Sequence, residues 1–341
     1  MTTRFANIWV KAVASKHREH AKVRADQFGV DCCTVDEMLA DPEVNLIVNL
    51  TPVGVHYEII KAALQAGKHV YTEKTLTDDL TKAAALLEIA KENNLYLGSA
   101  PDTFLGAGIQ TAKSVLEAGT IGEVTGFAIT ANRDWGLLMN VLPFLRERGP
   151  GMCYDYAVYH ITALVSLLGS VSSVAAFTTY PKPYKFMIPN TPQYGQELVC
   201  PNETRISATL AMKSGVTGTV MMDGDSVMKE QTLFRIYGTK GILELGDPNQ
   251  FGSQVRVLVP PRDPRQKADY KTVEFVNQYT DDSRGIGVSI MADEIINRKR
   301  NQMDVQLAYH VMEILAGIIE SGENHRFVEM KSDCGIPTLL K

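Results

Sequence analysis

The sequence has few cysteines, no long apolar run and no large basic block. Its five cysteines form no CxxC pair, so we expect free thiols in a reducing cytoplasm instead of disulfides or zinc ligands. No apolar run approaches the ~18–20 residues of a membrane span. The net charge is -5, with no basic block beyond residues 298–300. These absences argue against nucleic acid or a membrane as the main partner.

Other absences narrow the functional class. The amino-terminal residues carry neither the apolar core of a secretory signal nor an Arg/Ser-rich transit pattern. His17 and His20 form an i,i+3 pair, but two ligands are too few for a stable metal site, so we expect no metal. Ser99 and Ser114 lack the GxSxG setting of a serine hydrolase. With 341 residues, the sequence predicts a cytoplasmic two-domain protein that acts on small molecules.

Residues 1–100 alternate between short apolar runs and amphipathic helices. Thr34 and Glu37 have capping-box spacing, Thr77 is expected to cap another helix, and Gly29 and Gly67 stand where helices end. Strands are expected at 8–14, 46–50, 69–72 and 95–98, and helices at 16–28, 34 onward, 55–66 and 77–93. This alternation predicts crossover connections and a parallel sheet.

The pattern changes after about residue 100. Seven β-rich runs follow one another closely, which predicts mostly antiparallel pairing. The proline-rich stretch 181–203 is expected to be a loop. The β-rich runs are 171–179, 204–212, 216–222, 232–237, 241–245, 255–259 and 272–276; an eighth strand is expected at 124–131, and helices at 106–117, 154–168, 287–297 and 305–320. We therefore predict an α/β domain over 1–100 and an α+β domain over 101–341 with a large, mostly antiparallel sheet.

Two strand ends in the first domain carry unusual residues. The strand ending near Leu50 continues into Thr51, Pro52 and Gly54, where a missing Cβ lets a flat ring approach the backbone. The next strand ends in Glu73 and Lys74. Ligands bind outside the carboxyl ends of parallel strands, so the sequence indicates a pocket there. The alternative is a solvated ion pair at a strand end.

The second domain contributes Asp155, Tyr159 and His160. If a helix begins near Asp155, Asp155 and Tyr159 lie four residues apart on one face, and His160 lies about 100° further round. A carboxylate, a phenol and a nearby amine can together remove a hydroxyl proton while a hydride leaves carbon. The alternative is a carboxylate at a helix N-terminus beside a core tyrosine.

These clusters, in this order, resemble the Gfo/Idh/MocA family of nicotinamide-dependent oxidoreductases. The resemblance rests on TPVGVH (51–56), AALQAGKHVYTEK (62–74), APDTFLGAGIQTAKSVLEAGTIGEV (100–124) and GPGMCYDYAVYHITALVSLLG (149–169). It implies that Lys74 is the catalytic lysine and that Asp155 lies beside the reacting carbon. Tyr159 stands where the family usually has histidine, and His160 follows it, so both remain candidates.

The resemblance also implies a cofactor and partners. Thr51, Pro52, His56, Glu73 and Lys74 would contact the nicotinamide dinucleotide. Arg133 and Trp135 would contact a carbohydrate-like substrate lying between the domains, because a Trp ring covers the apolar face of a sugar. The last helix and tail would pack back on the first domain. Since the family covers its broad sheet by pairing subunits, a homodimer or homotetramer is expected.

One segment of the family pattern is not found. The first strand, the GxGxxG turn and the first helix should precede residue 4, so the sheet is expected to have a gap where that strand would lie. After the strand at 8–14 stand Ser15, Lys16, His17 and Arg18, a serine with cations that suits a 2′-phosphate, so NADP is predicted over NAD. The alternative is a solvated helix start.

The sequence therefore predicts an NAD(P)-dependent oxidoreductase acting on a sugar, a polyol or a related hydroxy compound. One alternative is a non-catalytic or cofactor-impaired family member that serves as a sugar-binding or structural protein. Another is a glycosidase or lyase that uses bound nicotinamide transiently.

Overall fold

The computed structural model describes residues 4–149, 151–226, 233–261, 263, 265–299 and 302–340; Pro150, Thr232 and Arg300, which fall within predicted features, lie outside them. The chain divides into two compact units. Unit 1 comprises Met1–Asp102 and Arg284–Tyr309, and unit 2 comprises Thr103–Ser283 and His310–Lys341. The division after Asp102 coincides with the change of sequence pattern, whereas residues 284–309, expected in the second domain, group with the first.

Unit 1 contains two parallel sheets. The smaller sheet pairs β1 (Ala12–Val13) with β2 (Asp31–Cys32), and the larger has the order β3 (Leu46–Asn49), β4 (His69–Thr72), β5 (Leu97–Ser99). The predicted strand 8–14 is much longer than the observed one, and β2 was not predicted. Within the described residues β3 has β4 as its only partner strand, so the two sheets are separate.

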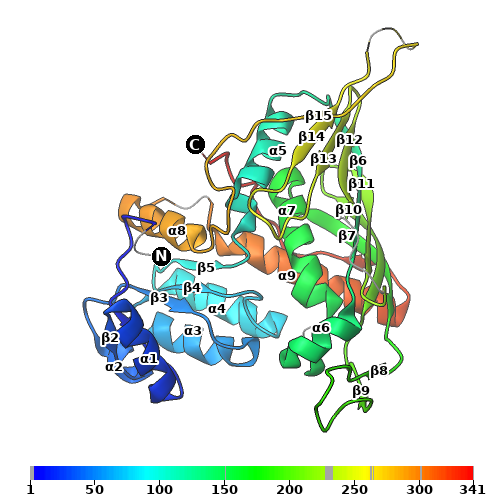
Figure 1. Cartoon of the computed structure of the whole chain (residues 1–341). Helices are drawn as coiled ribbons and strands as arrows, with labels where there is room; N and C mark the ends of the chain where they lie inside the picture. The colour runs from blue at the N-terminus through cyan, green and yellow to red at the C-terminus, as the bar shows by residue number, and fades with distance from the viewer. Residues whose placement is uncertain are drawn as a thin grey trace. The chain divides into compact units, whose positions relative to one another are not determined.

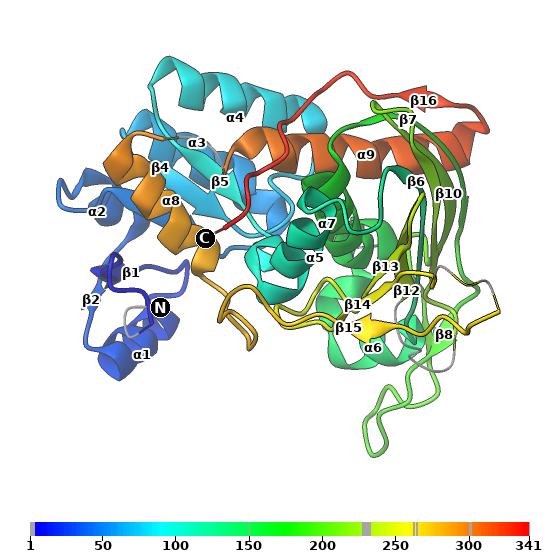
Figure 2. The same cartoon turned by 90° about the horizontal axis from the view of Figure 1, so that it is seen from above.

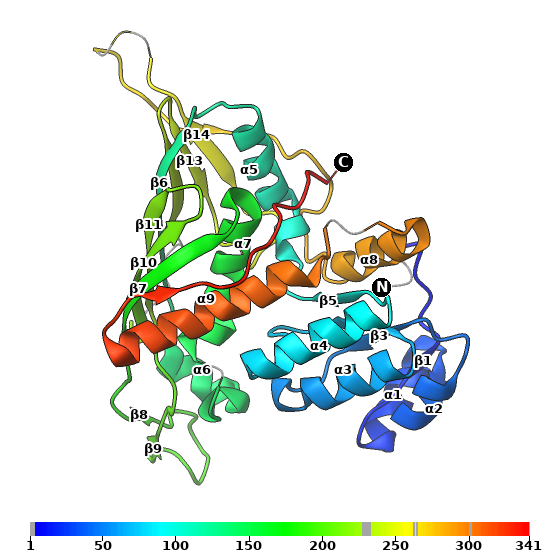
Figure 3. The same ribbon diagram turned by 180° about the vertical axis from the view of Figure 1, so that it is seen from behind.

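Helices cover both faces of the larger sheet in unit 1. Helices α3 (His56–Gln65) and α4 (Leu80–Glu92) lie on one face and α8 (Ile286–Asn297) on the other (Figures 1 and 3). The remaining helices are η1 (Val53–Val55), α1 (Arg18–Phe28), which ends at Gly29, and α2 (Val35–Ala40), which begins with the predicted Thr34 capping box. The prediction that Thr77 caps α4 is wrong, because the Asp79 carboxylate accepts the Lys82 N–H at 2.9 Å.

Unit 2 is built on one nine-stranded sheet in the order β15-β14-β13-β12-β6-β11-β10-β7-β16. Pairing is antiparallel except between β6 and β11. The strands are β6 (Val124–Asn132), β7 (Val171–Thr179), β10 (Arg205–Met212), β11 (Thr217–Asp223), β12 (Leu233–Gly238), β13 (Ile242–Leu245), β14 (Val255–Leu258), β15 (Lys271–Thr272) and β16 (Val328–Glu329). Of these, β15 is shorter than predicted, and β16 was not predicted.

Helices of unit 2 lie on one face of this sheet (Figure 1). They are η2 (Thr103–Leu105), α5 (Ala107–Glu117), α6 (Trp135–Val141), η3 (Pro143–Arg146), η4 (Cys153–Ala157), α7 (Val158–Leu168) and α9 (Val305–Asn324), which begins in unit 1. A Cβ on Gly106 would lie 2.6 Å from Phe251 Cα, so the glycine lets the start of α5 approach this backbone. The stretch 181–203 is not all loop, because β8 (Tyr184–Lys185) and β9 (Glu197–Leu198) form a hairpin in it.

The carboxyl-terminal tail of unit 2 is fixed along the sheet edge and α9. After β16 it runs beside α9, and the Leu340 N–H donates to Gln110 Oε1 on α5 at 2.7 Å (Figure 2). The Glu313 carboxylate accepts the Lys331 and Ser332 N–H groups, each at 2.9 Å. These contacts explain why the residues after the last long helix are ordered.

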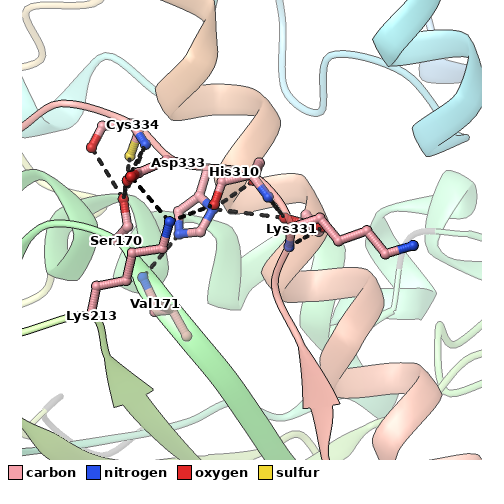
Figure 4. Close-up of polar contacts among 9 residues, drawn as sticks. Ser170, Val171, Lys213, His310, Lys331, Asp333 and Cys334 are labelled. Carbon is pink, nitrogen blue, oxygen red and sulfur yellow. Dashed lines mark hydrogen bonds and ion pairs between the residues drawn. The ribbon is translucent and has the colours of Figure 1, made fainter. Parts of the chain in front are cut away.

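A buried histidine joins the tail to the sheet (Figure 4). His310 Nε2 accepts the Val171 N–H at 2.9 Å, so the ring proton is on Nδ1, which donates to Ser332 Oγ at 2.7 Å. Burial lowers the pKa of His310, which keeps the ring neutral. Asp333 adds an ion pair to Lys213 at 3.1 Å.

The five cysteines are free thiols. Among the helices that the structure describes, none is long and apolar enough to cross a membrane.

Candidate functional site

The loops after β3 and β4 emerge side by side in unit 1. The strands are parallel, and their last residues, Asn49 and Thr72, are paired in register. Thr51–Pro52 and Glu73–Lys74 therefore leave the sheet at the same edge. The structure therefore brings the predicted residues Thr51, Pro52, Glu73 and Lys74 to one edge. Ligands of open parallel sheets bind at this edge.

A buried asparagine joins the two strand ends. Asn49 Nδ2 donates to Thr72 Oγ1 at 3.0 Å, and Asn49 Oδ1 accepts the Thr51 hydroxyl at 2.7 Å. The Glu73 N–H donates to the Asn49 carbonyl at 2.9 Å. Asn49 therefore fixes where both loops begin. The sequence alone did not indicate this residue, because a single asparagine in a strand carries no motif.

His56 joins the same two loops further along. Its ring is buried, with Nε2 2.7 Å from the Thr51 carbonyl oxygen and Nδ1 2.9 Å from that of Thr75. Both ring nitrogens are thus engaged by backbone, so His56 acts on the site through the loops it connects. Glu73 and Lys74 are half-buried, and the Lys74 N–H donates to Glu73 Oε2 at 3.1 Å.

The predicted adenosine-side residues lie at the end of β1. Ser15, Lys16 and Arg18 are exposed, and Arg18 is the first residue of α1. Ser15 Oγ accepts the His17 N–H at 3.4 Å. A helix N-terminus with exposed cations is a suitable place for an anion.

In unit 2, Asp155 lies in the π-helical turn η4, which continues into α7. The Asp155 N–H donates to the Gly151 carbonyl at 2.9 Å. Asp155 and Tyr159 are both half-buried, whereas His160 is fully buried. Asp155 in η4 and Tyr159 in α7 are therefore partly open to solvent, whereas the His160 side chain is enclosed in the core.

His160 belongs to a buried aromatic cluster. Its ring packs edge-on against Tyr156 at 4.9 Å, and Tyr156 Oη donates to Asp247 Oδ2 at 3.1 Å. Burial lowers the pKa of His160 to about 4, so it is neutral near pH 7. Arg133 covers the other part of this cluster, with its guanidinium carbon 3.9 Å from the Tyr156 ring centroid.

The two residues predicted to contact substrate differ in exposure. Arg133 is half-buried and lies against the ring of Tyr156, the residue that follows Asp155 in the turn. Trp135 is completely buried at the start of α6, which is the packing of a core residue. Unit 2 therefore brings Arg133, but not the Trp135 ring face, to the surroundings of the turn.

Two family models match the chain. One, described as an oxidoreductase family with an NAD-binding Rossmann fold, matches residues 1–100. The other, described as the GFO/IDH/MocA C-terminal domain, matches residues 109–244. The chain belongs to the Gfo/Idh/MocA family of oxidoreductases. The matched ranges contain the candidate residues of both units.

Curated members of the family match parts of the chain. An uncharacterized oxidoreductase of Schizosaccharomyces pombe is 34% identical over 142 residues, 42% of this chain and 38% of the relative. Levoglucosan dehydrogenase of Pseudarthrobacter phenanthrenivorans is 30% identical over 172 residues, 49% and 44% of the two chains. The scyllo-inositol 2-dehydrogenase (NADP(+)) of Bacillus subtilis is 28% identical, with 42% and 40% covered. The matches thus span less than half the length of these relatives.

Solved structures in the family share the fold over most of the chain. Levoglucosan dehydrogenase in complex with NADH and L-sorbose has a TM-score of 0.80 at 22% identity, covering 94% of this chain and 90% of that chain. A putative NADPH-dependent oxidoreductase of Desulfitobacterium hafniense has a TM-score of 0.79 at 18% identity, covering 96% and 92%. The Rossmann-like parallel sheets followed by a large mixed sheet are therefore the family fold, as predicted.

Proposed function

We propose that this protein is an NAD(P)-dependent oxidoreductase that transfers a hydride between nicotinamide and a hydroxyl-bearing carbon of a sugar, a polyol or a related compound. The observation that carries the proposal is the shared edge of β3 and β4, where Lys74 and the Thr51–Pro52 loop emerge together. This edge lies in the part that matches the NAD-binding family model. Relatives named for levoglucosan and scyllo-inositol support a hydroxylated ring as the substrate class.

The residues of unit 1 fit a nicotinamide dinucleotide. A Cβ built on Gly54 would meet no atom within 4 Å, so the space beside this residue of the loop is open. Ser15, Lys16 and Arg18 would hold the phosphate on the adenosine ribose, which favours NADP over NAD. When bound, the nicotinamide supplies the group that accepts or donates the hydride.

The chain's own residues handle the proton and the hydroxyl group. Lys74 takes the hydroxyl proton when the alcohol is oxidised and returns it in the reverse direction. Of the two candidates next to Asp155, Tyr159 shares this proton. The other candidate, His160, does not, because it is fully buried and has a pKa of about 4. Asp155 orients the hydroxyl beside the reacting carbon, and Arg133 adds positive charge next to the turn.

Fluorescence titration with reduced cofactors tests the proposal. We expect the full chain to bind NADPH in the micromolar range and NADH at least tenfold more weakly, because the exposed cations after β1 favour a 2′-phosphate. Exchange of Lys16 and Arg18 for alanine should weaken NADPH binding and leave NADH binding nearly unchanged.

The same titration separates the alternatives. No binding of either cofactor at millimolar concentration would contradict the proposal and favour a sugar-binding or structural role. Binding without net reduction of any hydroxy compound in a broad panel would favour a glycosidase or lyase. Tighter binding of NADH than NADPH would contradict only the cofactor preference.

We also propose that two copies pair through the helix-free face of the unit 2 sheet. One row across this face runs through Phe177, Ser207, Met221 and Thr130, which are neighbours in register on four adjacent strands. Phe177 is 68% exposed and Met221 is 49% exposed. This row of small and apolar side chains is suited to a self-complementary contact.

Sedimentation velocity tests this pairing. We expect a dimer, or a tetramer formed from dimers, and we expect Met221→Arg to shift the protein toward monomer because it introduces buried unpaired charges on both copies. Exchange of the exposed Val23 of unit 1 for arginine is the matched control and should leave the assembly unchanged. A wild-type monomer at tens of micromolar would contradict the pairing.

A further inference from the structure

Two consecutive residues of unit 2 hold the segment that leads into the Asp155 turn. Asn202 and Glu203 are both buried and stand just before β10. Asn202 Oδ1 accepts the Gly149 N–H at 2.8 Å, and Asn202 Nδ2 donates to the Glu147 carbonyl at 2.7 Å. The asparagine therefore fixes the first part of the segment.

Glu203 fixes the second part of the segment. Its carbonyl accepts the Met152 N–H at 3.1 Å, and its Oε1 accepts the Cys153 N–H at 2.8 Å. Cys153 is the first residue of η4, the turn that carries Asp155. The carboxylate thus satisfies a backbone donor at the start of this turn, as a capping side chain does at a helix N-terminus.

Gly151 allows the carboxylate to reach the backbone. A Cβ at this position would lie 2.2 Å from Glu203 Oε1 and 2.3 Å from Oε2, far inside van der Waals contact. The Gly151 carbonyl in turn accepts the Asp155 N–H at 2.9 Å. The Glu203 carboxylate therefore packs against Gly151, whose carbonyl bonds Asp155. It also accepts a hydrogen bond from Cys153, two residues before Asp155.

We propose that Asn202 and Glu203 are positioning residues that hold the Asp155 turn in its working geometry. This inference rests on the proposed function, in which Asp155 orients the substrate hydroxyl. Neither residue is part of the motifs that indicated the site, and neither is assigned a contact with substrate. Small displacements of an orienting group cost large factors in rate, so a held turn matters for catalysis.

The surroundings of Glu203 make its hydrogen bond sensitive to substitution. The carboxyl group is nearly inaccessible to solvent, and burial raises its pKa to about 7, while the Cys153 N–H opposes that rise. The titratable groups around it include Glu323 on α9, Cys153, Tyr154, Tyr180 and Cys200. Loss of the carboxyl oxygen leaves the Cys153 N–H buried without this acceptor, which loosens the turn.

Four variants of the chain test the inference. We expect Glu203→Ala to lower kcat at least tenfold with the KM for the cofactor unchanged, and Glu203→Gln, which keeps an acceptor oxygen, to restore kcat to within about threefold. Gly151→Ala should also lower kcat, but it should add no further loss in the Glu203→Ala background, because the clash is with the carboxylate. Hydrogen exchange of the peptide 151–157 should be at least tenfold faster in Glu203→Ala.

Glu313→Gln is the matched control. Glu313 is a half-buried carboxylate of unit 2 that also accepts backbone N–H groups, and it holds the tail instead of the turn. It should leave kcat and the exchange of peptide 151–157 unchanged. An equal loss of kcat in Glu313→Gln and Glu203→Ala, or unchanged exchange of the peptide in Glu203→Ala, overturns the positioning role.

Failure of the proposed function gives a different result. Wild-type turnover that persists in Asp155→Asn would remove Asp155 from the reaction and with it the catalytic meaning of the turn. The exchange measurement needs no substrate, so it reports separately whether Glu203 holds the segment.

Discussion

Replacing Lys74 with methionine is expected to lower turnover by about 10²–10⁴-fold, the range typical of a lost general acid or base. Methionine keeps an unbranched side chain of similar length at this half-buried position but cannot carry a proton. Folding should therefore be retained, while the proton of the substrate hydroxyl loses its acceptor. The measurement is kcat with saturating NADP and a substrate found by the panel, together with the NADPH titration.

Lys82→Met is the matched control for this experiment. Lys82 lies in the same unit, is half-buried, and forms a surface ion pair with Asp78 at 2.9 Å. Surface pairs contribute little to stability, so this variant should behave as wild type. Near-normal turnover in Lys74→Met would remove the lysine from the mechanism. An equal loss of turnover in both variants would indicate that removing a positive charge from unit 1 lowers turnover wherever the charge lies, and that the position of Lys74 has no special role.

The edge that carries Lys74 was predictable because its signals are local. Apolar runs separated by helices with correct stop residues predict parallel strands, and β4 has the predicted bounds. The Thr34 capping box and the left-handed Gly29 were equally readable, since each depends on neighbours within four residues. The local pattern predicted the wrong cap at Thr77, because in the structure Asp79, two residues later, caps α4.

Elements with weak local signals were missed. Strand β2 has two residues, one of them charged, and is defined by its pairing with β1. Helix α6 has seven residues and follows directly after a long strand, so no helical repeat is visible in the sequence. Tertiary packing around the fully buried Trp135 explains this helix better than its composition does.

The support of the candidate site was not readable for a related reason. Glu203 bonds a residue 50 positions earlier, and Asp247 bonds one 91 positions earlier. No spacing rule connects such pairs, whereas Asp155 and Tyr159 lie in one continuous motif. Sequence also left Tyr159 and His160 open, because adjacent helical positions differ by about 100° in direction and only packing distinguishes the core side.

The stability of the protein should depend on pH through Glu203. Its pKa is about 7 in the folded state against an ordinary 4.5, because burial disfavours the charged form. Between these values the folded state binds a proton that the unfolded chain has released, so the unfolding free energy falls as pH rises. The difference corresponds to about 3 kcal/mol across this window.

His160 opposes this trend in the same unit. Burial lowers its pKa from 6.5 to about 4, so between these values the unfolded chain binds a proton that the folded state does not. Its contribution to stability therefore rises with pH over about 4 to 6.5, while that of Glu203 falls. The wild-type curve is expected to be flatter there than either contribution alone, because the two oppose each other.

Glu203→Gln should reveal the hidden dependence. With the carboxyl group removed, the urea midpoint should rise between pH 5 and 6.5, since Glu203 no longer offsets the contributions of His160 and His310, and the midpoint should exceed that of wild type most above pH 7. Glu313→Gln is again the control, because the pKa of Glu313 is lowered by its hydrogen bonds, so its contribution is lost only as pH falls below about 4.5. Parallel curves for wild type and Glu203→Gln from pH 5 to 7.5 would show that Glu203 exchanges no proton on folding in this range. The carboxyl group would then already be ionised beneath the Asp155 turn, and the Cys153 N–H would outweigh the burial that separates it from water.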